Sequence, residues 1–80
     1  MTKDEVTRAV LEALRHIAPE VDPASLRRDV PIRDQVDIDS MDFLNFLVEL
    51  HSALKVEIPE SAYRDVATLD GCVAYIMRCA

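Results

Sequence analysis

The chain has 80 residues, half of them apolar, but it holds no Trp, two Phe and two Tyr. This length leaves room for one domain, residues 1–80, and the composition predicts a mostly aliphatic core. The formal net charge of −6 argues against nucleic acid and anionic lipid as partners, because binding either one normally begins with Lys and Arg neutralising the phosphates.

Residues 2–17 are predicted to form the first helix. Thr2 suits the N-cap, and Asp4 and Glu5 in the first turn complement the helix dipole. Apolar residues three and four positions apart give the helix one apolar stripe, formed by Val6, Val10, Leu14 and Ile17. Pro19 ends this helix, because proline cannot continue the pattern of backbone hydrogen bonds.

Residues 19–39 are predicted to form a long loop, because they show no sustained hydrophobic period and contain three prolines. Loops of about twenty residues are uncommon in small domains and are usually functional. We expect four apolar side chains to anchor this loop to the core: Leu26, Val30, Ile32 and Val36.

The second main helix is predicted to begin at Ser40 and to end near Leu54. Its polar side chains form one narrow stripe, made of Asp42, Asn45, Glu49 and Ser52. Apolar side chains fill the rest of the circumference: Met41, Phe43, Leu44, Phe46, Leu47, Val48, Leu50 and Leu54. This arc is wider than one-sided packing requires. The helix is therefore either central to the bundle, or part of its apolar face is reserved for another contact.

Residues 55–58 are predicted to be extended, because Pro59 disfavours helix in the residue before it. Pro59 is then expected at the first position of a short helical turn that reaches Tyr63. Thr68 is expected to cap a last helix with apolar residues Leu69, Val73 and Ile76, and Met77 as a further candidate. The predicted fold is all-α, with three main helices, one short third helix and a long loop between the first two.

Residues with the chemistry for catalysis or metal binding are sparse. His16 and His51 have no Cys or carboxylate at metal-ligand spacing, so we expect both on solvated helix surfaces. Gly71 is the only glycine, so no glycine-rich phosphate loop is present. Asp37 and Asp39 resemble the start of a calcium loop, but the Gly and the terminal Glu of that loop are missing. We therefore expect neither an enzyme nor a metal site.

The two cysteines and the distribution of apolar residues bear on the compartment. Cys72 and Cys79 are seven residues apart, which on a helix is roughly 10 Å along the axis and too far for a disulfide. We expect reduced thiols. No apolar run approaches the ~20 residues that a membrane span needs, so the expected location is the cytoplasm.

Much of the excess negative charge lies in one stretch, residues 34–49. The acidic residues there are Asp34, Asp37, Asp39, Asp42 and Glu49, and the nearest basic residue is Arg33. Such a stretch suits basic protein partners, which the opposite field attracts at long range. It is equally consistent with solubility alone.

Ser40 lies where the acidic loop meets the most apolar helix. As an N-cap its hydroxyl would accept a backbone hydrogen bond worth about 1 kcal/mol. A capping box would then need Glu or Gln three residues later, where Phe43 stands. Asp39 serves equally well as the cap, which would leave the Ser40 hydroxyl free, and a phosphate ester there would lie near the positive end of the helix dipole. Both interpretations remain open.

Four short motifs, in order along the chain, resemble those of the acyl carrier protein family. The family's attachment motif is Asp-Ser-Leu followed by an acidic residue, and its later motifs are Glu-Ile-Pro, Thr-Leu and an aromatic residue before Ile. The corresponding residues are Asp39-Ser40-Met41-Asp42, Glu57-Ile58-Pro59, Thr68-Leu69 and Tyr75-Ile76. The resemblance covers essentially the whole chain.

This resemblance implies a four-helix carrier, expected to be a monomer. A phosphopantetheinyl transferase would attach 4′-phosphopantetheine from coenzyme A to Ser40, and acyl groups would be carried as thioesters on the thiol of this arm. Asp39 and Met41 would flank the arm. Basic patches on synthase, ligase or acyl-transferring enzymes would meet a surface of the second helix that includes Asp42, Asn45, Val48 and Glu49.

The chain departs from the family pattern around this motif. Gln35-Val36-Asp37-Ile38 stands where glycine is common, and Phe43 stands where a small or polar residue is usual. Positions that are commonly acidic hold Asn45, His51, Ser52 and Ala53. These departures suggest a specialised pathway.

Three functions remain open at this stage. The first is a carrier of fatty-acid or polyketide type, and the second is a carrier of an amino or aryl acid loaded by an adenylating ligase. The third, of a different class, is an unmodified helical interaction module in which Ser40 is only a cap.

Overall fold

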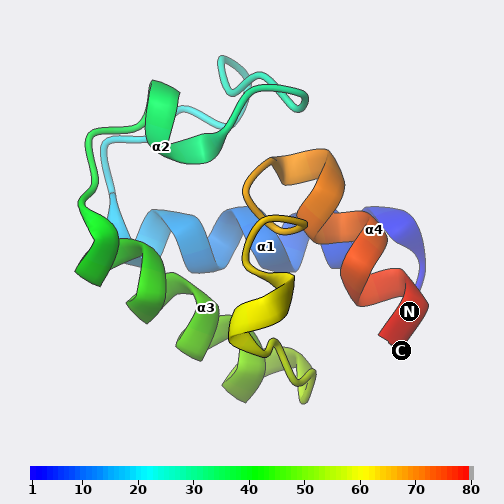
Figure 1. The fold of residues 1–80 in the computed structure, drawn as a ribbon. Coiled ribbons are helices and arrows are strands. Elements are labelled where there is room, and N and C mark those ends of the chain that lie inside the picture. Colours follow the sequence, from blue (N-terminus) through cyan, green and yellow to red (C-terminus); the bar gives the residue numbers. More distant parts are fainter. Residues whose placement is uncertain (80) are drawn as a thin grey trace.

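The computed structural model describes residues 1–79, in which the named elements are helices joined by loops (Figure 1). The elements are α1 (Lys3–Ile17), α2 (Ile32–Gln35), α3 (Ser40–Leu54), the 3₁₀ turn η1 (Glu60–Ala62) and α4 (Leu69–Cys79). The predicted all-α fold with three main helices is confirmed. α1 packs against both α3 and α4 and is therefore the common support of the bundle.

α1 begins at a capping box. The hydroxyl of Thr2 accepts a hydrogen bond from the Glu5 amide at 3.2 Å, and the Glu5 carboxylate accepts one from the Thr2 amide at 2.8 Å. Val6, Val10 and Leu14 are fully buried. The predicted apolar stripe therefore forms the face that α1 presents to the core.

The connection between α1 and α3 is more ordered than predicted, because it contains the four-residue helix α2. The fully buried side chain of Ile32 begins this helix, and its amide donates to the carbonyl of Ala67 at 2.8 Å. The loop before α2 is also joined to the start of α4. The Asp70 amide donates to the Arg28 carbonyl at 3.0 Å, and Arg28 Nε donates to Asp70 Oδ1 at 2.8 Å. A single helical turn is too short to show a hydrophobic period, so this element depends on tertiary contacts.

α3 divides its wide apolar arc between two environments. Phe46, Leu47 and Leu50 are buried in the core. Three others are exposed in spite of their size: Met41 (63%), Leu44 (38%) and Val48 (57%). The helix is thus one wall of the bundle, and it also presents an uncovered apolar ridge, defined here as Met41, Leu44 and Val48.

The C-terminal part of the chain, from the end of α3 through α4, differs from prediction in three details. Lys55 is not extended, because it ends α3 in the left-handed conformation, with φ 57°. Pro59 is the N-cap of η1 rather than its first helical residue. Met77 is exposed. The predicted cap of α4 is confirmed, because the Thr68 hydroxyl accepts a hydrogen bond from the Gly71 amide at 2.9 Å.

The histidines were predicted on helix surfaces and the cysteines as reduced thiols. His16 and His51 are exposed, but each has a partner: His16 Nδ1 contacts the Glu49 carboxylate, and His51 Nδ1 is 3.1 Å from the Val56 carbonyl. Both cysteines are free thiols. Among residues 1–79, no helix has the length and apolar character needed to cross a membrane.

Candidate carrier site at Ser40

Asp39, and not Ser40, is the N-cap of α3. Its backbone is extended (φ −93°, ψ −176°), and its Oδ1 accepts a hydrogen bond from the Asp42 amide at 2.8 Å. Asp42 Oδ2 in turn accepts from the Asp39 amide at 3.3 Å, which completes a capping box. Ser40 is the first residue of the helix proper. Within residues 1–79 its hydroxyl takes no part in the capping hydrogen bonds, and the residue is exposed.

Sequence reasoning considered Asp39 as a cap but did not find its partner. Phe43 stands three residues after Ser40 and cannot complete a capping box with it. Starting from Asp39, the third residue is Asp42, whose shorter carboxylate serves the purpose of the usual Glu. The Asp-x-x-Asp spacing was therefore the feature of the sequence that could have identified this capping box.

A largely apolar cavity of about 500 Å³ opens beside Ser40. Three segments form it: the start of α3, the residues around α2, and the turn that follows η1. Its lining residues are Pro31, Arg33, Ser40, Met41, Phe43, Leu44, Tyr63, Arg64 and Ala67. The backbone hydrogen bond from Ile32 to Ala67 holds two of these walls together. We call this cavity the Ser40 pocket.

A second, smaller hollow of about 200 Å³ continues along α3. Leu44 and Tyr63 line both cavities, and the smaller one adds Val48 and Ile58 among its apolar residues. The exposed apolar ridge of α3 therefore forms part of the border of both cavities. An apolar surface extends from Ser40 toward the middle of the helix.

The residues predicted to flank the arm or to meet partners have different environments. Met41 lines the Ser40 pocket, whereas Asp39 and Asp42 are engaged in the capping box. Glu49 is engaged with His16 across the α1–α3 contact. Asn45 and Val48 are exposed. Asn45 and Val48 are thus more available to a partner than Asp42 and Glu49, which are partly buried and already have partners.

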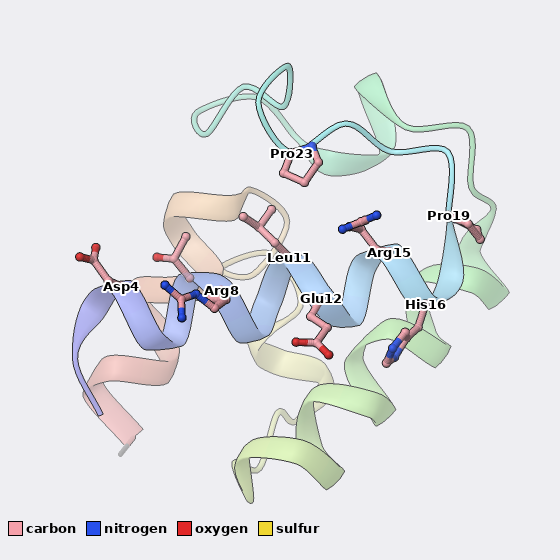
Figure 2. Close-up of a pocket in the computed structure, with 9 residues that line it drawn as sticks. Asp4, Arg8, Leu11, Glu12, Arg15, His16, Pro19 and Pro23 are labelled. Carbon is pink, nitrogen blue, oxygen red and sulfur yellow. The ribbon is translucent and has the colours of Figure 1, made fainter.

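A cavity larger than the Ser40 pocket, about 720 Å³, lies elsewhere, along α1 beneath the loop that carries Pro23 (Figure 2). Figure 2 shows Leu11 and Arg15 of α1 on the side toward Pro23, with charged residues of both signs along the helix, namely Asp4, Arg8 and Glu12. The groove is open and mixed in charge. None of the sequence motifs contributes to it, so it is not the candidate site.

The cysteine thiols provide no nucleophile at this site. Burial raises the pKa of the Cys72 thiol to about 12. That thiol therefore stays protonated at neutral pH, and the thiolate is the nucleophilic form. Cys79 is exposed near the end of α4. Within the described part of the chain, no group of three or more His, Cys, Asp or Glu side chains is placed to hold a metal ion.

The site has the properties that a covalently attached arm requires. An exposed hydroxyl that is not needed for capping is free to form an ester. The adjacent apolar pocket offers a surface on which a flexible apolar chain attached there is able to lie. The residues present therefore fit a phosphopantetheine group.

Comparisons with known proteins agree with this geometry. The family model described as "Phosphopantetheine attachment site" matches residues 5–76. The acyl carrier protein of Campylobacter concisus is 30% identical over 71 residues, which cover 85% of this chain and 92% of that protein. The acyl carrier protein of Rubrobacter xylanophilus is 24% identical over 71 residues, covering 85% and 88%. That of Lactobacillus acidophilus is 30% identical over 57 residues, 71% of each chain.

The match to the family model extends over most of the chain, from within α1 to near the end of α4. It therefore includes the capping box, Ser40 and the pocket. The chain belongs to the acyl carrier protein family, whose phosphopantetheine attachment domain holds 4′-phosphopantetheine covalently.

Proposed function

We propose that Ser40 is the residue that bears the 4′-phosphopantetheine arm, and that the chain carries acyl groups as thioesters on that arm without catalysing a reaction itself. The observation that supports this most directly is the division of roles at the start of α3. Asp39 and Asp42 cap the helix. The exposed Ser40 hydroxyl beside an apolar pocket is thereby left for modification.

The attachment step is a transfer between coenzyme A and the hydroxyl. A phosphopantetheinyl transferase would remove the proton of Ser40, and the oxygen would form a phosphodiester as the 3′,5′-adenosine bisphosphate leaves. Because Ser40 Oγ makes no capping hydrogen bond, α3 does not have to lose its cap for this reaction. Modification should therefore leave the start of the helix intact.

The Ser40 pocket supports an apolar cargo. Its walls include Met41, Phe43, Leu44 and Tyr63. Each methylene that leaves water for such a surface gains up to about 0.8 kcal/mol. A short acyl chain that folds back against these walls would therefore be partly protected from water, together with its thioester.

The surface around the pocket supports partners that combine apolar and basic groups. The exposed ridge of Met41, Leu44 and Val48 offers apolar contact. Asp34 and Asp37, both exposed, lie just before α3 and add negative charge. Opposite charges on an enzyme would raise the rate of encounter, and apolar contacts would hold the complex. We expect synthase or ligase partners in the cytoplasm, where the two free thiols stay reduced.

Intact-mass measurement tests this proposal. The purified chain, incubated with coenzyme A and a phosphopantetheinyl transferase, should gain the mass of one phosphopantetheine. Ser40→Ala should gain none. Ser52→Ala, which changes another exposed serine of α3, should be modified like the wild type. No added mass with several transferases, or modification that persists in Ser40→Ala, would contradict the proposal.

The cargo is tested next, on the modified protein. Incubation with fatty-acid or polyketide loading enzymes is compared with incubation with adenylating ligases that activate amino and aryl acids. We expect acyl thioesters, because the pocket walls are mostly apolar. Charging by adenylating ligases alone would assign the chain to the other kind of carrier.

A further inference from the structure

Two arginines belong to the lining of the Ser40 pocket. Arg33 lies in α2 and Arg64 in the turn that follows η1. The hydrogen bond from the Ile32 amide to the Ala67 carbonyl, 2.8 Å long, joins the two segments that carry them. Residues far apart in the sequence thus bring two arginines to the lining of a cavity that Ser40 also lines.

These two arginines have no carboxylate partner within residues 1–79. The ion pairs of the described residues are His16 with Glu49 and Arg28 with Asp70. The chain has 15 acidic and 9 basic residues. Arginines with unused hydrogen-bond donors beside the modification site of an acidic protein therefore suggest an anionic ligand, since guanidinium binds phosphate and carboxylate oxygens in bidentate fashion.

Ser40 has several acidic neighbours, so a negatively charged group attached to it would be stabilised by positive charge nearby. Asp37, Asp39 and Asp42 lie within three residues of it in the sequence, and Asp34 lies in α2. A phosphodiester on Ser40 would add another negative charge among these carboxylates, and like charges repel. Within the pocket lining, Arg33 and Arg64 are the cationic side chains.

We propose that Arg33 and Arg64 bind the phosphodiester of the phosphopantetheine arm and hold the base of the arm against the Ser40 pocket. This inference rests on the proposed attachment at Ser40. The arm has two methyl groups close to its phosphate, and the apolar side chains of Met41 and Tyr63 line the same pocket. One site thus provides donors for the phosphate and an apolar surface for the methyl groups beside it.

The arm's phosphate fits this pocket better than an acidic cargo does. The phosphate is bonded to the oxygen of Ser40, so it is always beside the pocket that Ser40 lines. A carboxylate on the cargo would be at the far end of the arm and would have to fold back to reach the same arginines. The constant proximity of the phosphodiester lowers the entropic cost of its binding.

Phosphorus-31 NMR of the modified protein tests this inference. Wild type, Arg33→Gln/Arg64→Gln and the control Arg27→Gln are loaded with the arm, and intact mass confirms the loading before any spectrum is recorded. Arg27 is exposed in the same connection but does not line the pocket. The chemical shift and relaxation rate of the phosphodiester are then measured at low ionic strength and with added NaCl.

We expect the ratio of bound to free phosphodiester to fall about threefold for each arginine removed, as for an exposed ion pair. In the double variant the resonance should therefore move and its transverse relaxation should slow, whereas Arg27→Gln should match the wild type. Added NaCl should move the wild-type resonance in the same direction, because exposed charges are screened. Because the salt titration uses the wild-type protein alone, it tests the contact even if a variant fails to fold. Arg33→Lys/Arg64→Lys, which keeps the charges, should lie between wild type and the Gln variant.

The possible failures are distinguishable. An added mass combined with a phosphorus resonance that neither the double variant nor salt changes would overturn the arginine contact and leave attachment at Ser40 standing. A change that appears only when the thiol carries a dicarboxylic acyl group would assign the arginines to cargo and also overturn the inference. No added mass on the wild type would overturn the proposed function, and with it this contact.

Discussion

Asp39 and Asp42 each accept a hydrogen bond from the other's backbone amide, at 2.8 and 3.3 Å, and so close the start of α3 around Ser40. From the sequence, Ser40 could be either the cap of α3 or a residue with a free hydroxyl. The neighbouring carboxylates stabilise the helix terminus, and the serine between them stays exposed. The cap of α3 therefore does not depend on the hydroxyl of Ser40.

Ser40→Ala should leave the unmodified protein as stable as the wild type, within about 0.5 kcal/mol. The reason is that the hydroxyl is exposed and makes no capping hydrogen bond. Urea unfolding followed by circular dichroism measures the difference. A loss of about 1 kcal/mol would show that Ser40 acts as the cap after all.

Asp39→Ala should destabilise the unmodified protein by about 1 kcal/mol, because it removes the side-chain acceptor that caps α3. Asp39→Asn keeps an acceptor oxygen at the same position and should recover most of this loss. Asp37→Ala, which removes an exposed carboxylate two residues earlier, is the control and should change stability by less than about 0.5 kcal/mol. Equal effects of Asp39→Ala and Asp37→Ala in urea unfolding would contradict the cap.

Gly71→Ala should destabilise the protein by about 1 to 3 kcal/mol, although alanine normally favours a helix over glycine by about 1 kcal/mol. A Cβ at this position would lie 2.1 Å from the carbonyl oxygen of Asp65 and 2.9 Å from Thr68 Oγ1. The first contact involves backbone, so the turn before α4 would have to move. Ala74→Gly, at an exposed site of the same helix, is the control and should lose only about 1 kcal/mol. A more stable Gly71→Ala would contradict the close approach.

The buried thiol of Cys72 should make stability fall at alkaline pH. Burial raises its pKa from 9.0 to about 12. Between these values the unfolded chain ionises and the folded one does not, so the unfolded state binds fewer protons and the free energy of unfolding decreases as pH rises. The limiting slope is about 1.4 kcal/mol per pH unit. Below pH 9 this contribution should be constant.

Cys72→Val tests this pH dependence, because it removes the ionisable group from the buried site. The slope above pH 9 should become shallower in the variant, whatever its absolute stability, when urea unfolding is measured under reducing conditions. The pKa of Tyr75 is also raised, and desolvation is the largest cause. Because Tyr75 is present in both proteins, it does not account for a difference between their slopes. Identical slopes in the two proteins would contradict the assignment to Cys72.

Val48→Asp should weaken productive encounters with partner enzymes without unfolding the protein. Val48 is 57% exposed in the apolar ridge of α3, so its loss should change stability by less than about 0.5 kcal/mol. The kcat/KM of a loading enzyme for the modified carrier should fall. Ala53→Asp adds the same charge at another exposed position of α3, away from the ridge, and should have a smaller effect. Equal losses would point to net charge instead of the ridge.

Local signals in the sequence were sufficient for the three main helices. Thr2 and Thr68 cap α1 and α4 as predicted, and the apolar repeat of α1 forms the buried face. Caps and periodicity act within a few residues, so they are readable without a structure. α2 was missed because a four-residue helix spans little more than one turn, which is too short for an apolar pattern to repeat. Burial of Ile32 and its hydrogen bond to Ala67 hold this helix in place.

By itself the sequence determined an acidic, aliphatic, all-α chain with Ser40 at the start of its most apolar helix, because these properties depend on composition and near neighbours. The Asp-x-x-Asp spacing was a local signal for Asp39 as the cap of α3, and the structure showed that Asp39 caps the helix while Ser40 does not. Only the tertiary structure placed Arg33 and Arg64 in the lining of one pocket. Contacts between distant segments arise when the chain packs, and no local pattern encodes them.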